Sequence, residues 1–158
     1  MPDVPAKQIF GSAQTVINTA TDIAANNFSG APAATFDNTT DAVVPYAQFA
    51  NAMIEMPDWA AAPVANTSVE LWGVLLNTDG TEDDTDAPSG TASGGARPFG
   101  SWTVAAVDAL QRRTIVIDLT GVLQVDFYIK NGTAQNMNND AGTNCVVKIT
   151  PFSFGVNV

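Results

Sequence analysis

The side chains best suited to chemistry are three carboxylates, Glu55, Asp58 and Glu70. Two carboxyl groups about 5 to 9 Å apart can hydrolyse a glycoside, one as general acid and the other as nucleophile or base. Each of these three lies in or beside an expected strand, where alternation points polar side chains outward as a matter of course. Nothing in the sequence places any two of them at that distance, so we assign them no catalytic role.

The chain has no histidine, which removes many of the common catalytic arrangements. Without an imidazole there is no Ser-His-Asp or Cys-His nucleophile, no general base that titrates near neutral pH and no metal site with a His ligand. We predict that the protein is not an enzyme and has no catalytic, cofactor-binding or metal-binding residues.

One cluster of acids resembles a metal site. It consists of Asp79, Glu82, Asp83, Asp84 and Asp86, within a polar stretch from residue 79 to 95. Calcium takes several oxygen ligands from a flexible loop, but in an EF-hand a glycine follows three alternating ligands and a glutamate closes the loop. Here the glycine, at position 80, comes too early. We expect a solvated or interacting loop and keep calcium as the alternative.

Cys145 is the single cysteine, so the chain can form no internal disulfide and holds no Cys-x-x-Cys pair. It begins the strand-like run Cys145-Val146-Val147-Lys148-Ile149. A cysteine in that setting is expected to be a small buried hydrophobic residue rather than a nucleophile.

Three tryptophans are candidates for stacking on a sugar: Trp59, Trp72 and Trp102. Trp72 lies inside the most hydrophobic run and is expected in the core. Trp59 follows Pro57 and Asp58 in a connection, so it is the better candidate for an exposed binding residue. Four Asn-x-Ser/Thr sequons, at Asn27, Asn38, Asn66 and Asn131, are attributed to an Asn/Thr-rich composition, because no signal peptide is recognised.

Charge is unevenly distributed along the chain. The net charge is −10; residues 1–96 carry twelve acids and one base, and residues 97–158 carry four acids and five bases. Such an acidic surface repels nucleic acid and favours solubility, and it suits a basic partner. Arg112 and Arg113 form a small basic spot that pairs either with a neighbouring subunit or with this protein's own carboxylates.

No apolar run approaches the roughly 18 residues of a membrane helix. We expect the protein to be kept in a cytosol, or packed into something assembled there.

The sequence pattern predicts strands for the segments that hold these side chains. Residues 1–12, with two prolines and a glycine, are expected to form an extended N-terminal arm, and residues 13–158 one domain. Residues 46–56 are alanine-rich and compatible with a helix, but the bracketing prolines and the surrounding pattern favour a strand. Residues 108–113 are expected to form a short turn of helix. The expected strands are 14–19, 34–36, 46–56, 68–76, 99–107, 114–119, 124–130 and 144–152.

The run from Ser68 to Leu76 is apolar at both sets of alternate positions, which predicts a strand covered on both faces. Asn131-Gly132 marks a turn where a positive φ is easily adopted. About eight short strands with no long amphipathic helix predict an all-β chain, a single β-sandwich of jelly-roll type.

Several segments together resemble a known class of protein. They are Phe36-Asp37-Asn38-Thr39-Thr40-Asp41, Tyr46-Ala47-Gln48-Phe49, Val69-Glu70-Leu71-Trp72 with the Asp79-Gly80 loop, Gln111-Arg112-Arg113-Thr114-Ile115, residues 125–135 and Val147-Lys148-Ile149-Thr150-Pro151-Phe152. This succession, over roughly residues 34 to 153, resembles small β-sandwich virion structural proteins of tailed bacteriophages.

The resemblance implies a non-enzymatic capsid decoration or cement protein that stabilises the phage head. It implies the major capsid protein or other virion subunits as partners, a place in the virion, and no catalytic residues. A homo-oligomer is expected, with a trimer as the working guess. The alternatives are another head-neck, tail or fibre-base component, or a carbohydrate-binding adsorption module.

Overall fold

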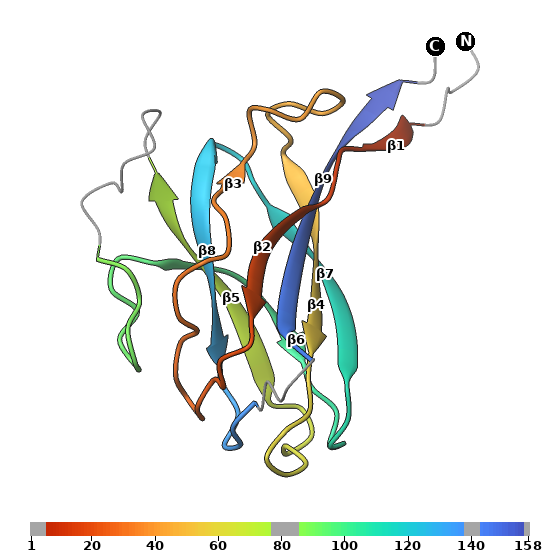
Figure 1. The fold of residues 1–158 in the computed structure, drawn as a ribbon. Coiled ribbons are helices and arrows are strands. Elements are labelled where there is room, and N and C mark those ends of the chain that lie inside the picture. The colour runs from red at the N-terminus through yellow and green to blue at the C-terminus, as the bar shows by residue number, and fades with distance from the viewer. Residues whose placement is uncertain (1–5, 77–85, 138–142, 157–158) are drawn as a thin grey trace.

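A computed structural model describes residues 6–76, 86–137 and 143–156, and shows an all-β sandwich of two antiparallel sheets (Figure 1). The strands are β1 (Ala6–Phe10), β2 (Gln14–Thr19), β3 (Phe36–Asp37), β4 (Phe49–Met56), β5 (Ser68–Leu76), β6 (Arg97–Thr103), β7 (Gln111–Asp118), β8 (Gln124–Asn131) and β9 (Cys145–Val156). The predicted fold class is confirmed, and the described residues form nine strands in place of about eight.

Strand pairing follows a nested pattern. Beyond β1, the first strand pairs with the last and so on inward: β2 with β9, β3 with β8, β4 with β7, and β5 with β6. One sheet runs β2-β9-β4-β7 and the other β3-β8-β5-β6. A long antiparallel ribbon rolled up in this way is the jelly roll, with two Greek keys.

The core lies between the sheets and follows strand alternation. In β4 the buried residues are Ala50, Ala52, Ile54 and Met56, while the residues between them are half-buried on the outer face. Val69 and Leu71 of β5 and Phe127 and Ile129 of β8 cover the core from the second sheet. The alanines of β4 made the sequence of this segment compatible with either a helix or a strand. In the structure they are the small, inward-facing residues of a strand.

A second, smaller cluster lies on the outer face of the β3-β8-β5-β6 sheet. Phe28, Val74 and Tyr128 are buried there, and Trp72 and Ala96 pack against them. The expectation that β5 is covered on both faces is therefore confirmed.

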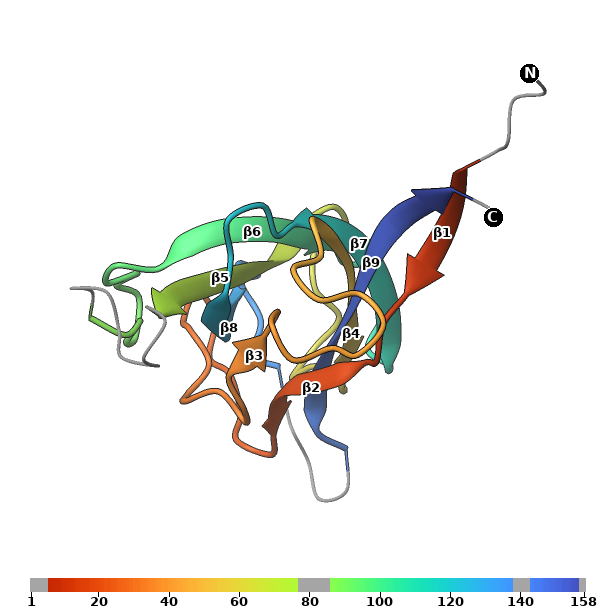
Figure 2. The ribbon, with the colours of Figure 1, turned by 90° about the horizontal axis from the view of Figure 1, so that it is seen from above.

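β1 and the distal end of β9 form a two-stranded ribbon that leaves the body of the sandwich (Figures 1 and 2). The register runs from Ala6 opposite Val156 to Phe10 opposite Phe152. β4 ends its pairing with β9 at Phe49, opposite Phe152, so the ribbon begins where the sheet stops. β1 lies within the segment expected to be an arm, and its pairing with β9 was not anticipated.

Two local expectations are wrong. Residues 108–113 form no turn of helix, because β7 already begins at Gln111. The Gln111 side chain donates to the carbonyls of Ala105 and Val107 and accepts from the Ala105 N–H, which fixes the connection without a helix. β6 correspondingly ends at Thr103 rather than Val107.

Gly132 does not have the positive φ that the Asn-Gly pair made available. A Cβ at this position would lie 2.7 Å from the Ser68 carbonyl oxygen, so close approach to β5 requires the glycine. Among the described segments, none is a helix long and apolar enough to cross a membrane.

Candidate interaction surface

Two of the three candidate carboxylates, Glu55 and Glu70, lie on opposite sides of the sandwich. Glu55 lies on the outer face of β4, where its Oε2 is 3.3 Å from Nη2 of Arg112. Glu70 alternates with the core residues Val69 and Leu71, so it lies on the outer face of the opposite sheet, and accepts a 2.8 Å hydrogen bond from Nε1 of Trp72. The body of the sandwich therefore separates Glu55 from Glu70, and Asp58 is exposed just after β4.

Of the five residues of the acidic cluster, the described residues include Asp86, and the other four lie outside them. Within the described ranges, no group of three or more His, Cys, Asp or Glu side chains is placed to hold a metal ion. Cys145 is fully buried, and burial raises the pKa of its thiol to about 12, so the thiol stays protonated near neutral pH.

Trp59 is buried, with 2% of its surface exposed, so the expectation that it is an exposed binding residue is wrong. Its backbone N–H donates to Asp108, and it bridges to Met137 inside the fold. Trp102 is also buried and donates to the Ala52 carbonyl. Trp72 lies half-buried on the outer face rather than in the sandwich core as expected, packed edge-on against Phe28.

Two of the four sequon asparagines are structural hubs. The amide of Asn38 donates to the carbonyls of Ala47 and Val122 and accepts from the Ala47 N–H. The Asn131 amide donates to the carbonyls of Ile23, Ala24 and Gln135. Both side chains are buried and fully engaged, which explains these sequons by folding rather than modification.

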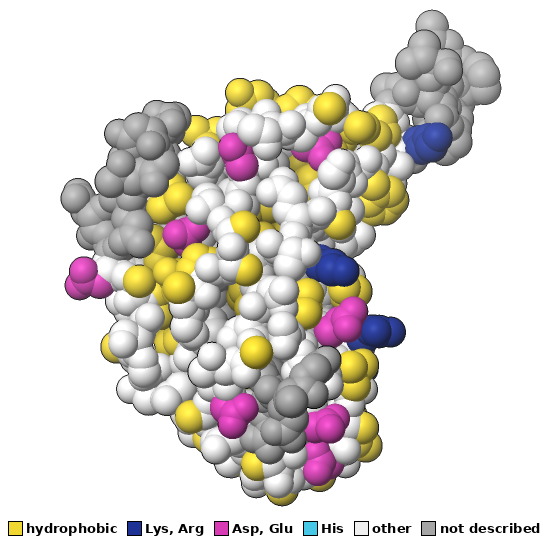
Figure 3. Space-filling model, viewed as in Figure 1, with side chains coloured by type: hydrophobic (Ala, Val, Ile, Leu, Met, Phe, Trp, Pro, Cys, Tyr) yellow, Lys and Arg dark blue, Asp and Glu magenta, His cyan; other side chains and the backbone are white. Residues whose placement is uncertain are grey.

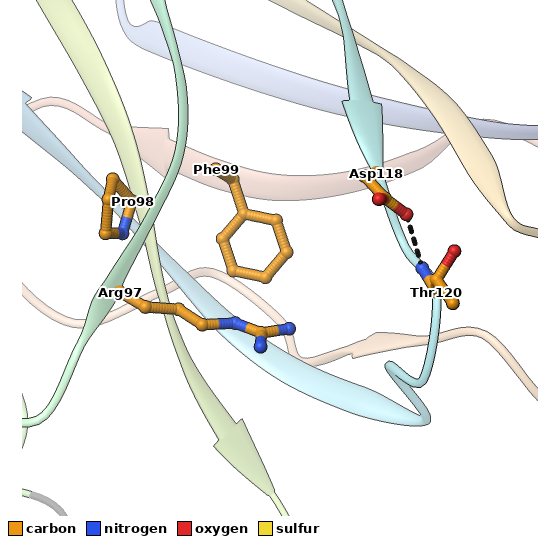
Figure 4. Close-up of a pocket in the computed structure, with 5 residues that line it drawn as sticks. All are labelled: Arg97, Pro98, Phe99, Asp118 and Thr120. Atoms are coloured by element: carbon orange, nitrogen blue, oxygen red, sulfur yellow. Dashed lines mark hydrogen bonds between the residues drawn. The ribbon is translucent and has the colours of Figure 1, made fainter.

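A shallow pocket of about 240 Å³ lies where β6 and β7 face each other across the open edge of the sandwich (Figure 4). The Arg97 guanidinium lies over the Phe99 ring, 5.0 Å from its centroid, with Asp118 across the pocket. The Thr120 backbone N–H lowers the pKa of Asp118 more than the charge of Arg97 does. Because Arg97 lies over one face of the Phe99 ring, that face is not open for a sugar to stack on.

The ribbon carries phenylalanines on one face. Phe10 and Phe152 are cross-strand partners, and Phe154 lies two residues farther along the same face of β9. Phe49 of β4 stacks on Phe152 at 5.8 Å, and Phe154 meets both rings edge-on. These four phenylalanines, which we call the aromatic ladder, bury Phe152 but leave Phe10 48% and Phe154 63% exposed.

Asp41 fixes the root of the ribbon. Its carboxylate accepts from the Ser12 N–H at 2.6 Å and from the N–H groups of Val43 and Val44 at 2.8 Å. The Ser12 N–H, followed by that of Val44, holds the pKa of Asp41 below its ordinary value of 3.8. The turn after β1 and the loop before β4 are thereby tied together.

The same loop contains Tyr46, which is 65% exposed. Its backbone has a positive φ, of 55°. That left-handed conformation is costly for a bulky residue. It is held because the Tyr46 N–H donates to the Asn38 carbonyl at 2.7 Å, beside the buried Asn38 hub. Val43, in the same loop, is also largely exposed.

Apolar side chains therefore gather at the ribbon end of the molecule, over the β3–β4 loop and the ribbon root (Figure 3). Half of the eight large hydrophobic residues that are exposed among the described residues lie here: Phe10, Val43, Tyr46 and Phe154. Scattered apolar residues are ordinary on a protein surface, whereas a gathered set is a candidate interaction surface.

Sequence reasoning missed this surface because it ended the last strand at Phe152. The alternation of Phe152, Ser153 and Phe154 continues the strand pattern and was the available signal. The pairing of the two chain ends had no local signal.

Arg112 and Arg113 both engage this protein's own groups. Arg112 is paired with Glu55, while Arg113 donates to the Thr103 and Arg112 carbonyls and to Gln111. A neighbouring subunit and the protein's own groups were the two partners considered for this basic spot. The contacts in the structure are made within the chain.

No protein-family model and no curated protein matches this chain, so its residues and their geometry are what bear on its function.

Proposed function

We propose that this protein is a non-enzymatic structural subunit of a tailed-phage particle, a decoration or cement protein that binds the assembled head. The jelly roll is an architecture used in viral capsids, although lectins and other proteins share it. The sequence resemblance described above supplies the more specific part of the proposal.

The single observation that carries a binding role is the ribbon with its aromatic ladder. A two-stranded ribbon is marginally stable in water, and this one exposes two phenylalanines beyond the sandwich. Aromatic residues, phenylalanine among them, are enriched at the cores of protein interfaces. Tyr46, at the same end, adds an exposed residue of the type that most often dominates binding energy.

Other features suit a subunit that stays soluble until a lattice is present. A net charge of −10 on 158 residues limits self-aggregation of the free protein. On a particle, many weak contacts through a projecting ribbon add up by multivalency. The candidate sugar-binding role loses its specific basis, because Trp59 is buried.

Deletion of residues 1–12 tests the proposal, because it removes β1 and Phe10 while leaving the sandwich strands in place. We expect the truncated protein to keep its β-type circular dichroism and a cooperative thermal transition, and to bind particles at least about tenfold more weakly. Deletion of residues 1–5, which retains β1, is the matched control and should bind normally. Normal binding by the longer deletion would rule out the ribbon as the attachment element.

The copy number per particle separates the decoration role from its alternatives. Hundreds of copies indicate the shell, and a dozen or fewer indicate a neck, tail or fibre-base part. Absence of the protein from purified virions would overturn the proposal altogether.

A further inference from the structure

The outer edge of β1 is an unpaired strand edge within the described residues. The Gly11 N–H donates to the Pro151 carbonyl at 2.8 Å, toward β9. Antiparallel strands alternate the direction of their backbone groups, so Lys7 and Ile9 also face β9. The N–H and C=O groups of Gln8 and Phe10 consequently point away from β9, toward the side where the described structure has no strand.

We propose that this edge pairs with the same edge of a second copy, antiparallel and about a two-fold axis centred on Gln8. In that register Gln8 lies opposite Gln8 of the second copy, and the two residues exchange N–H···O=C bonds. Lys7 lies opposite Ile9, so no like charges face each other across the pair. The product is a four-stranded sheet in the order β9-β1-β1-β9.

The pairing places both aromatic ladders on one side of the new sheet. Gln8 is the cross-strand partner of Phe154, and Phe10 of Phe152, so all four share a face of the ribbon. Opposed residues in a pair share a face, so the phenylalanines of both copies line the same side. Two marginal two-stranded ribbons thus become one four-stranded sheet with an apolar face, which passes the threshold of about three strands for independent stability in water.

Charge favours the ribbon over the body as the point where two copies meet. β1 and residues 152–156 contain one charged residue, Lys7, whereas the whole chain carries a net charge of −10. Two acidic bodies repel each other, and a contact made through ribbons that project from the sandwich keeps them apart (Figure 2). The geometry therefore selects a second copy meeting end to end rather than body against body.

The contact is small. Five-residue strands with two half-covered phenylalanines bury well below the roughly 1,200 Å² of a standard interface. The free protein should therefore dimerise weakly, with a dissociation constant above about 10 μM, and more completely wherever copies are concentrated. A two-fold pair closes at two copies, so a dimer is predicted in place of the trimer guessed from the resemblance.

The test compares Gln8→Pro with Gln8→Thr in the full-length protein, by analytical ultracentrifugation over about 10 μM to 1 mM. Proline removes the outward N–H at position 8 and is tolerated where that N–H faces solvent, so the bond to β9 survives. We expect wild type and Gln8→Thr to show a concentration-dependent dimer. Gln8→Pro should raise the dissociation constant at least about tenfold, the loss expected from two hydrogen bonds.

Amide hydrogen exchange supplies an independent readout. The Lys7 and Ile9 amides should be protected in the monomer and in Gln8→Pro, which shows that the ribbon is intact. Protection of Gln8 and Phe10 should appear only as wild-type concentration rises. A monomer at every concentration, a trimer, or a dimer that Gln8→Pro leaves unchanged would each overturn the proposal. None of these measurements involves particles, so their failure is separate from failure of the virion role.

Discussion

The outer faces of the two sheets are finished in different ways. On the β3-β8-β5-β6 sheet, Phe28 bridges to β8 at Lys130 and covers Trp72, and its N–H donates to the Gly90 carbonyl, so loops of the same chain close the face. On the β1-β9-β4-β7 sheet, Phe49 and Met53 stay half-buried and Phe154 is largely exposed. One apolar face is covered by loops of the chain itself, and the other leaves apolar side chains exposed.

This difference shows that apolar residues on an outer face can have two different roles. An apolar residue that its own loops cover contributes to the free energy of unfolding, because folding removes it from water. An apolar residue that stays exposed contributes little to folding but becomes available to a partner. Truncation of an aromatic ring to alanine should therefore lower the free energy of unfolding on the covered face and weaken partner binding on the exposed face.

The largest effect is expected on the closed face. Phe28→Ala removes a ring that is 7% exposed and packs at 5.6 Å from Trp72, leaving a cavity against Val74 and Tyr128. We expect a loss of about 3 kcal/mol in the free energy of unfolding, measured by denaturant titration, with particle binding unchanged. A loss below about 1 kcal/mol would mean that the face is not closed in solution.

The next prediction tests whether specific hydrogen bonds hold the β3–β4 loop at the ribbon end. Asn38→Ala leaves the Ala47 N–H and the Ala47 and Val122 carbonyls without their buried side-chain partner, and so frees the Ala47 end of the loop beside Tyr46. We expect a loss of about 2 kcal/mol in stability. Amide exchange should show faster opening in residues 43–47. A uniform change across the chain, with no local opening, would contradict a local role for Asn38.

A smaller and pH-dependent effect is expected at the ribbon root. Hydrogen bonds to the charged form hold the folded-state pKa of Asp41 below 3.8, so its contribution is full above the unfolded pKa and lost as pH falls through the folded value. Asp41→Asn should cost about 1 kcal/mol at pH 7. The gap from wild type should be full above the ordinary Asp pKa of about 3.9 and should narrow as pH falls below it, as followed by thermal melts from pH 7 to 2. A gap that is constant with pH would mean that charge is not involved.

The features that local pattern dictates were predictable. The run Ser68–Leu76 was placed at its observed bounds, and the alternation in Gln124–Lys130 identified the core residues Val125, Phe127 and Ile129. Strand spacing and turn residues then sufficed for a jelly-roll sandwich. Each of these depends on the side chain's own strand and its immediate neighbours.

The predictions that were wrong concern features that depend on contacts between residues far apart in the sequence or on the bonds of a single side chain. Trp59 was expected to be exposed because it follows a proline in a connection, but it is buried and its backbone pairs with Met137, about eighty residues later. The Gln111 side chain replaced an expected helical turn by bonding back to Ala105 and Val107. The ribbon joins the first described strand to the last, and hydrophobic periodicity carries no information about which strands meet.

The smallest stability effect is expected from Phe154→Ala on the open face. This ring is 63% exposed, so its truncation should change the free energy of unfolding by no more than about 1 kcal/mol. The same change removes an anchor of the aromatic ladder, so particle binding should weaken by about tenfold, measured by cosedimentation. Leu110→Ala, at an exposed apolar residue away from the ladder, is the matched control and should alter neither quantity. If Phe154→Ala instead destabilised the fold as much as Phe28→Ala, the ladder would be an extension of the core, and the contrast between the two faces would not hold.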